Sequence, residues 1–225
     1  MKKVNVFFNK LYHNVPGYVF GLLAFIFGFL GTILALLLSP DYVMWEKSIS
    51  VLGHKKGGLF LRIGLILFGI ASIPFLIYFA RTLHNEDVNE YLTKGGLYAS
   101  IFSAITTILT EIFTGVNEFI STLHGLFALL SWMGGAIFLT LFSIVMRKNP
   151  NFSKVQIYVS FIVTGIFIFY LIPFFITNFC SYYPDLCYSF GRAVYTIVPT
   201  TEWIVHFGIL FWGLFNSSYF LYKKI

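Results

Sequence analysis

Long runs of apolar residues alternate with short polar stretches along almost the whole chain. A helix that crosses a hydrocarbon core of about 30 Å needs roughly 20 residues, because each residue advances the helix by about 1.5 Å. Six runs meet this length, at residues 17–38, 59–83, 95–115, 122–146, 155–179 and 200–222. The pattern predicts an all-α fold, a polytopic membrane protein in which residues 17–222 form one six-helix bundle.

The segment before the first span, residues 1–16, has a different pattern. Its apolar residues recur at helical spacing: Val4, Phe7, Phe8, Leu11 and Tyr12. This spacing indicates a short amphipathic helix along the cytoplasmic membrane surface, and a frayed, disordered tail is the alternative. The next apolar run is too long for the core of a signal peptide, and no small-residue cleavage site follows it, so we do not expect cleavage.

The first span carries a continuous stripe of small residues. They are Gly17, Gly21, Ala24, Gly28, Gly31 and Ala35, alternately four and three apart. In lipid, small residues at this spacing let a neighbouring helix approach closely. We interpret the stripe as a packing surface and not as a groove for a cofactor.

The composition supports the membrane assignment and excludes an ordinary soluble domain. Of 225 residues, 58% are hydrophobic and 11% are charged, and the mean hydropathy is +0.82. Soluble domains contain about 25% charged residues. The chain has no basic run with interleaved aromatic residues of the kind that follows a nucleic-acid backbone, so no nucleic-acid partner is expected.

Positive charge is divided unequally between the two sides of the predicted bundle. An even number of spans puts both termini on one side. That side carries Lys2, Lys3, Lys10, Arg81, Lys94, Arg147, Lys148, Lys154, Lys223 and Lys224, and the opposite side carries Lys47, Lys55, Lys56, Arg62 and Arg192. Ten basic residues against five predict, by the positive-inside rule, a cell-membrane protein with cytoplasmic termini.

Acidic and histidine side chains gather at the outer half of the predicted bundle. Glu111 ends the third span, His124 begins the fourth, and Glu202 and His206 begin the sixth. Glu118 lies in the short turn before His124, and His54 lies in the first outer loop. Ionisable residues near a membrane interior are costly, and each is a functional hypothesis by default.

The helical registers predict that these residues converge. One face of the third span is small and hydroxylated, comprising Gly96, Ser100, Ser103, Thr107, Thr110 and Thr114. His124, Ala128, Ser131 and Gly135 form a similar face on the fourth span. The short turn makes these helices antiparallel neighbours, which places Glu111 and His124 at similar depth. Glu202 and His206 share one face of the sixth helix and join them if that helix closes the bundle.

Three interpretations of this cluster remain open. The first is structural, with polar groups bonded to each other between helices. The second is a binding site for a lipid headgroup or a small polar ligand, formed by Glu111, Glu118, His124, Glu202, His206 and His54. The third is catalysis by Glu111, His124, Glu202 and His206, either as acids and bases or with a metal such as zinc.

Cofactor motifs are absent from the sequence, and we predict no cofactor. There is no HExxH and no GxSxG motif. His124, His206 and Glu202 remain metal candidates, and a haem between His124 and His206 is a weaker alternative. On the cytoplasmic side, Glu86, Asp87 and Glu90 indicate a solvated surface, because their spacing does not match a calcium loop.

The two cysteines, Cys180 and Cys187, lie in the last outer loop. An oxidising exterior favours a disulfide between them, which we expect to fasten this loop over the mouth of the bundle. Two reduced thiols at the membrane boundary are the alternative.

Several of these features together resemble a known group of membrane proteins. They are SISVLG at Ser48–Gly53, the sequence Glu111, Glu118 and His124 around a short turn, and Glu202 at the start of the last span. This pattern resembles the six-span FRAG/DRAM/SFK superfamily, especially its prokaryotic branch of unknown function, although the turn GVNEFIST is less proline-rich than in that group. The resemblance implies association with lipid and supplies no catalytic residues.

The sequence therefore favours a protein that binds or organises lipid, or a subunit of a homo-oligomer or membrane assembly. A membrane-embedded enzyme acting on outer-leaflet lipid headgroups is the alternative. A small-molecule transporter is a second alternative, weakened because the inner half of the spans has few charges and the chain has no clear repeat.

Overall fold

The computed structural model describes residues 2–86, 88–115 and 117–223, with side chains from residue 6 onward. The described residues form helices and no strand, so the predicted all-α fold is confirmed. The helices are α1 (Lys2–Asn14), α2 (Gly17–Leu37), α3 (Ile49–Gly53), α4 (Gly58–Thr82), α5 (Glu90–Ile112), α6 (Glu118–Lys148), α7 (Lys154–Tyr182), α8 (Pro184–Tyr195) and α9 (Val198–Lys223). Within this part of the chain, α2, α4, α5, α6, α7 and α9 are long and apolar enough to cross a membrane. The protein is a multi-pass membrane protein.

The six predicted spans correspond to these six helices, with differences at the ends. The largest is in α5, which begins at Glu90, five residues before the predicted start at residue 95. The side chain of Asn89 accepts a hydrogen bond from the backbone nitrogen of Tyr91 at 2.9 Å and so caps the helix. Hydropathy marks the apolar part of a helix, whereas capping residues decide where it starts.

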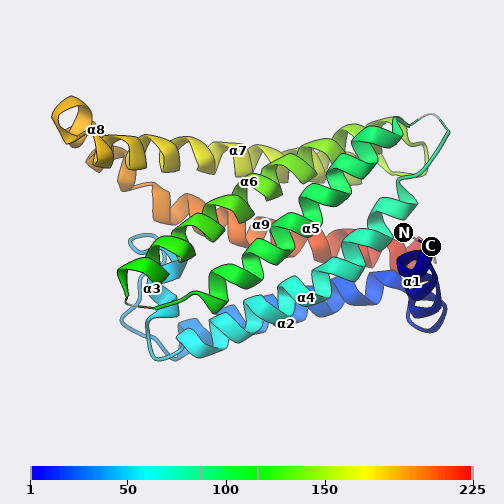
Figure 1. Cartoon of the computed structure of the whole chain (residues 1–225), viewed down its shortest axis with the longest axis horizontal. Coiled ribbons are helices and arrows are strands. Elements are labelled where there is room, and N and C mark those ends of the chain that lie inside the picture. The colour runs from blue at the N-terminus through cyan, green and yellow to red at the C-terminus, as the bar shows by residue number, and fades with distance from the viewer. Residues whose placement is uncertain (1, 87, 116, 224–225) are drawn as a thin grey trace.

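The spanning helices form a closed ring. Each contacts the next one along the chain, from α2 through α4, α5, α6 and α7 to α9, and α9 returns to contact α2. Figure 1 shows α1 and the last turns of α9 at one end of the bundle, here called the terminal end. The helices α3 and α8 lie at the opposite end, here called the loop end.

The small-residue stripe of α2 is a packing surface, as predicted. All six of its members are buried. At Gly31, a Cβ atom would lie 2.7 Å from the carbonyl oxygen of Phe60 and 2.8 Å from the Cα of Gly64. The backbones of α2 and α4 touch at this crossing, and a side chain would separate them.

Aromatic side chains fill the ring on the side of the terminal end. Phe75, Phe79, Phe138, Phe142 and Trp212 are buried and pack ring against ring. We call these five residues the aromatic plug. The indole nitrogen of Trp212 donates a hydrogen bond to the Oγ of Ser160 at 2.9 Å, so its polar edge is satisfied in the apolar interior.

The first segment is the helix α1, held against the terminal end of α4. The hydroxyl of Tyr12 donates to the carbonyl oxygen of Pro74 at 2.6 Å. Arg81 donates to the side chain of Asn9 at 2.8 Å, and its guanidinium lies 5.3 Å from the centre of the Tyr12 ring. The helical interpretation of residues 1–16 agrees with this arrangement.

Several predictions for the terminal end concern residues that the structure does not describe. Asp87 and Lys224 lie outside the described residues, as do the side chains of Lys2, Lys3 and Val4. Of the acidic loop, Glu90 forms an ion pair with Lys94 at 2.8 Å, and both side chains are exposed.

Two short helices at the loop end correct the prediction of plain loops. Residues 39–58 contain α3, and residues 180–199 contain α8. Neither has the long apolar run that marks a span, and α8 is interrupted at Cys187, where φ is −153° and ψ is 27°. Helices this short depend on tertiary contacts, which periodicity alone does not reveal.

Candidate functional site

A cavity of about 110 Å³ lies inside the ring, lined by all six spanning helices and by α3. Its polar lining residues include Ser50, Thr107, Thr110, Glu111, Thr114, His124, Ser131, Glu202 and His206. Its apolar lining residues include Leu61, Leu65, Phe68, Leu76, Ala104, Ile209 and Leu210. Phe75, Phe138 and Trp212 of the aromatic plug also line it and form its floor.

Four of the six predicted site residues meet at this cavity. They are Glu111, His124, Glu202 and His206. The other two, His54 and Glu118, have exposed side chains and do not line it. His54 follows the last residue of α3, and Glu118 is the first residue of α6, where the helix dipole stabilises a carboxylate in solvent.

His206 is buried and its tautomer follows from its partner. Its Nε2 lies 2.9 Å from the Oγ1 of Thr32, and this hydroxyl also lies 2.8 Å from the carbonyl oxygen of Gly28. A carbonyl only accepts, so Thr32 gives its one proton to Gly28 and accepts from Nε2–H. In the neutral imidazole, Nδ1 therefore keeps its lone pair, and it has no partner among the described residues.

Glu202 lies one helical turn before His206 and is 7% exposed. Its Oε2 accepts a hydrogen bond from the backbone nitrogen of Ile49 at 3.3 Å. Within the described part of the chain, Oε1 has no hydrogen-bond partner. One carboxylate oxygen thus holds α3, and the other is available to a ligand.

His124 is hydrogen-bonded through both ring nitrogens. Nδ1 lies 2.8 Å from the carbonyl oxygen of Thr110, which requires a proton on Nδ1. Nε2 lies 3.0 Å from the Oγ of Ser50 and accepts the serine proton in the neutral imidazole. Glu111 and His124 lie on neighbouring helices, but Glu111 does not bond to His124, because Thr110 and Ser50 occupy both ring nitrogens.

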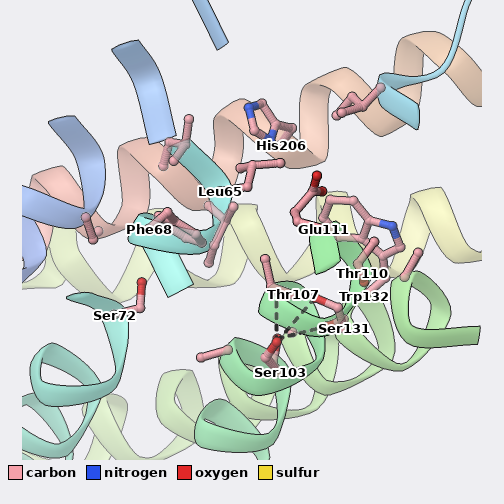
Figure 2. Close-up of a pocket in the computed structure, with 18 of the residues that line it drawn as sticks. Leu65, Phe68, Ser72, Ser103, Thr107, Thr110, Glu111, Ser131, Trp132 and His206 are labelled. Carbon is pink, nitrogen blue, oxygen red and sulfur yellow. Dashed lines mark hydrogen bonds between the residues drawn. The ribbon is translucent and has the colours of Figure 1, made fainter. Parts of the chain in front are cut away.

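Glu111 lines the cavity beside Thr110 and Trp132 (Figure 2). Among the described residues, its carboxylate has no hydrogen bond and no ion pair within 4.0 Å. Figure 2 shows Glu111 on α5 and His206 on α9 reaching the cavity from different walls. Both residues line the cavity, and the imidazole of His206 points toward α2, where its Nε2 meets Thr32.

The hydroxylated face of α5 packs against α6, as the registers predicted. The hydroxyls of Thr107 and Ser131 are 2.6 Å apart, and Ser103 donates to the carbonyl oxygen of Ser131 at 2.9 Å (Figure 2). Thr110 and Thr114 donate to carbonyl oxygens one turn earlier in α5. These hydroxyl protons are already used within the protein, so this wall has few free donors.

The helix α3 covers the loop end of the cavity, and we call it the α3 lid (Ile49–Gly53). The Ile49–Glu202 and Ser50–His124 hydrogen bonds join it to α9 and α6. Just before the lid, the hydroxyl of Tyr42 lies 2.6 Å from the carbonyl oxygen of Lys47 and accepts from the indole of Trp203 at 3.0 Å. Burial raises the pKa of the Tyr42 hydroxyl, so it keeps its proton at neutral pH.

The sequence did not identify Thr32 and Ser50 as site residues. Thr32 is 174 positions from His206, and Ser50 is 74 positions from His124. The signal for Ser50 was its place in SISVLG, but nothing in the sequence indicated which way the serine points.

The candidate ligands for a metal or a haem, His124, His206 and Glu202, have other hydrogen-bond partners in the structure. The described residues contain no group of three or more His, Cys, Asp or Glu side chains that could hold a metal ion, whereas zinc sites use three or four protein ligands. A haem between His124 and His206 would require His124 to give up one of its two hydrogen bonds.

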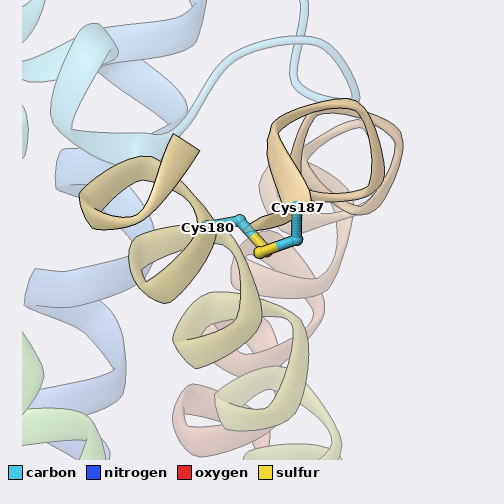
Figure 3. The surroundings of a disulfide bond; sticks show 2 residues. All are labelled: Cys180 and Cys187. Carbon is cyan, nitrogen blue, oxygen red and sulfur yellow. A yellow bond between two sulfur atoms is a disulfide. The ribbon is translucent and has the colours of Figure 1, made fainter. Parts of the chain in front are cut away.

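Cys180 and Cys187 form a disulfide that ties the start of α8 to the end of α7, with their Cα atoms 5.1 Å apart (Figure 3). We expected this loop to cover the mouth of the bundle. Instead, no described residue of α8 lines the cavity, and the α3 lid covers the mouth. Figure 1 shows α8 beyond the tip of α7 at the edge of the molecule, away from α3.

No family model, curated protein or solved structure matches this chain. The resemblance to the FRAG/DRAM/SFK superfamily therefore stays a prediction. Three of the sequence features that carry this resemblance, SISVLG, His124 and Glu202, are in contact. Ile49 of SISVLG is hydrogen-bonded to Glu202, and Ser50 of SISVLG is hydrogen-bonded to His124.

Proposed function

We propose that the protein binds an amphiphilic lipid inside its helix ring. The observation that carries this proposal is the form of the cavity, which has acidic and imidazole groups at its mouth and a closed apolar floor. A lipid has the same division, with a polar headgroup at one end and a hydrocarbon chain at the other.

The polarity of the lining changes along the cavity. On α9, Glu202 and His206 lie toward the loop end, and Ile209 and Leu210 follow toward the terminal end. On α4, the lining residues are apolar except for Ser72, and they are Leu61, Leu65, Phe68, Ser72, Phe75 and Leu76. A cavity of about 110 Å³ admits only a short part of a lipid. That part would contact apolar side chains on several helices, and burial is favourable by about 25 cal/mol for each Å².

The mouth favours a headgroup that donates hydrogen bonds. Among the described residues that line the mouth, the polar atoms without a hydrogen bond are Oε1 of Glu202, the carboxylate of Glu111 and Nδ1 of His206. Buried acceptors left without a donor are costly. An amine, amide or hydroxyl headgroup would satisfy them, whereas a headgroup with phosphate alone would add further acceptors.

We place the loop end at the outer face of the cell membrane, following the charge asymmetry of ten basic residues against five. The ligand would then come from the outer leaflet. The transporter alternative has less support, because the aromatic plug fills the ring between the cavity and the terminal end.

The test is native mass spectrometry of the full-length protein purified in a mild detergent. We expect one bound lipid with an amine, amide or hydroxyl headgroup, and its loss in Ala128→Phe, which adds a ring to the cavity wall. Leu126→Phe is the control, because Leu126 lies on the same helix and is 47% exposed. The proposal is wrong if the wild type retains no specific lipid, or if both variants retain it equally.

A further inference from the structure

The hydrogen bond between Ser50 and His124 has the geometry of a nucleophile and its base. The Oγ of Ser50 lies 3.0 Å from Nε2 of His124, within the range in which a histidine abstracts a proton. Nδ1 of the same ring donates to the carbonyl oxygen of Thr110 at 2.8 Å. A third group thus fixes the orientation and the tautomer of the base, as in serine-histidine enzymes.

The carbonyl oxygen of Thr110 determines which ring nitrogen of His124 carries the proton. Because Thr110 supplies only an acceptor, the proton of the neutral ring is on Nδ1, and Nε2 has a free lone pair toward Ser50. The opposite tautomer would leave Nδ1 facing a carbonyl without a proton. The resting arrangement is therefore the one that general-base catalysis requires.

The pair is accessible from the cavity. Ser50 and His124 both line it, and neither side chain is fully buried. Ser50 is held at the mouth, since the neighbouring Ile49 amide is bonded to Glu202. From His124, the cavity face of α6 continues through Ala128 to Gly135 and Phe138, away from the polar mouth. In an acyl lipid, the ester group lies at the corresponding boundary between headgroup and chain.

We propose that Ser50 is the nucleophile and His124 the base of a hydrolase that cleaves the ester of the bound lipid. The choice of substrate rests on the proposed lipid binding. The chemistry requires only the lipid ester and water.

The reaction has two stages, acylation of Ser50 and hydrolysis of the acyl-serine. The Oγ of Ser50 forms a bond to the acyl carbonyl carbon while its proton moves to Nε2 of His124. The ester C–O bond then breaks, and the leaving alkoxide takes that proton and departs as an alcohol. Water attacks the acyl-serine, His124 accepts one water proton and returns it to Oγ of Ser50, and a fatty acid is released.

The test uses an alkyl fluorophosphonate, which phosphonylates activated serines, on the full-length protein in detergent. We expect one phosphonyl group per chain in the intact mass, and peptide mapping should place it on Ser50. A serine that serves only to hold the lid would not be modified. Mapping on the wild type decides the question even if a variant fails to fold.

Variants give the second readout. We expect Ser50→Ala to abolish both labelling and hydrolysis of a monoacyl ester lipid, and His124→Gln to slow both by at least about 100-fold. Ser48→Ala and His54→Ala are the controls, because neither residue lines the cavity, and they should match the wild type.

Measuring the retained lipid in the same protein distinguishes failure of the hydrolase from failure of lipid binding. Unlabelled wild type that still retains a specific lipid would overturn the hydrolase and leave lipid binding intact. Labelling that maps away from Ser50, or that persists in Ser50→Ala, would also overturn it. Labelling at Ser50 without any retained lipid would support the pair of Ser50 and His124 as nucleophile and base, and it would contradict the proposed lipid binding.

Discussion

Single residues determine how the site's polar groups are presented. Thr32 determines the tautomer of His206, and the Thr110 carbonyl determines that of His124. Helical registers predicted that Glu111 and His124 would face one space, and that Glu202 and His206 would join them if the last helix closed the bundle. The partners of these residues were not predictable, since Thr32 and Ser50 approach from distant parts of the chain and nothing in the sequence fixes their side-chain directions.

At this scale, Thr32→Val is predicted to destabilise the protein. The substitution keeps the shape of the side chain but leaves the buried Nε2–H of His206 without an acceptor, at a cost of about 1–3 kcal/mol. Thermal unfolding in detergent would measure this loss of stability. Thr140→Val is the control, because Thr140 is half-buried and bonds only to the carbonyl of Ala136 in its own helix. Equal loss of stability in both variants would contradict this account of Thr32.

The elements differ in how far the sequence defines them. The six spans were predicted because a long apolar run has few alternatives to crossing a membrane as a helix. The α3 lid and α8 were not, because their helical structure depends on contacts such as Ile49 with Glu202 and on the disulfide from Cys180 to Cys187. The same contacts decided that α3, and not the cysteine loop, covers the cavity.

The close crossing of α2 and α4 supports a prediction about glycine. Gly31→Ala should destabilise the protein by about 1–3 kcal/mol, because its Cβ would lie 2.7 Å from a backbone oxygen that cannot rotate away. Gly165→Ala is the matched control, since a Cβ there meets nothing within 4 Å. Alanine also favours helix over glycine, so Gly165→Ala should leave the midpoint of thermal unfolding unchanged or raised. A Gly31→Ala variant as stable as the wild type would rule out the tight crossing.

The whole molecule is a closed ring of helices with a polar mouth at the loop end and the aromatic plug toward the terminal end. Chain-order neighbours and a contact between the first and last spans produce this ring. Sequence periodicity shows which face of each helix is polar, but it does not show the order of helices around a bundle. The closure of α9 against α2 therefore had to come from the structure.

The proposed orientation predicts which thiols are accessible in intact cells. After mild reduction of the disulfide, a membrane-impermeant maleimide should label Cys180 or Cys187, because both lie at the loop end. Without reduction there should be no labelling, since the chain has no other cysteine. Labelling only after the cells are lysed would reverse the orientation and place the cavity mouth in the cytoplasm.

The aromatic plug also bears on how tightly the bundle separates two compartments. Trp212 and the four phenylalanines of the plug fill the ring beside the cavity, so a ligand has no path past them toward the terminal end. Under the proposed lipid binding, the ligand therefore exchanges with the leaflet at the loop end.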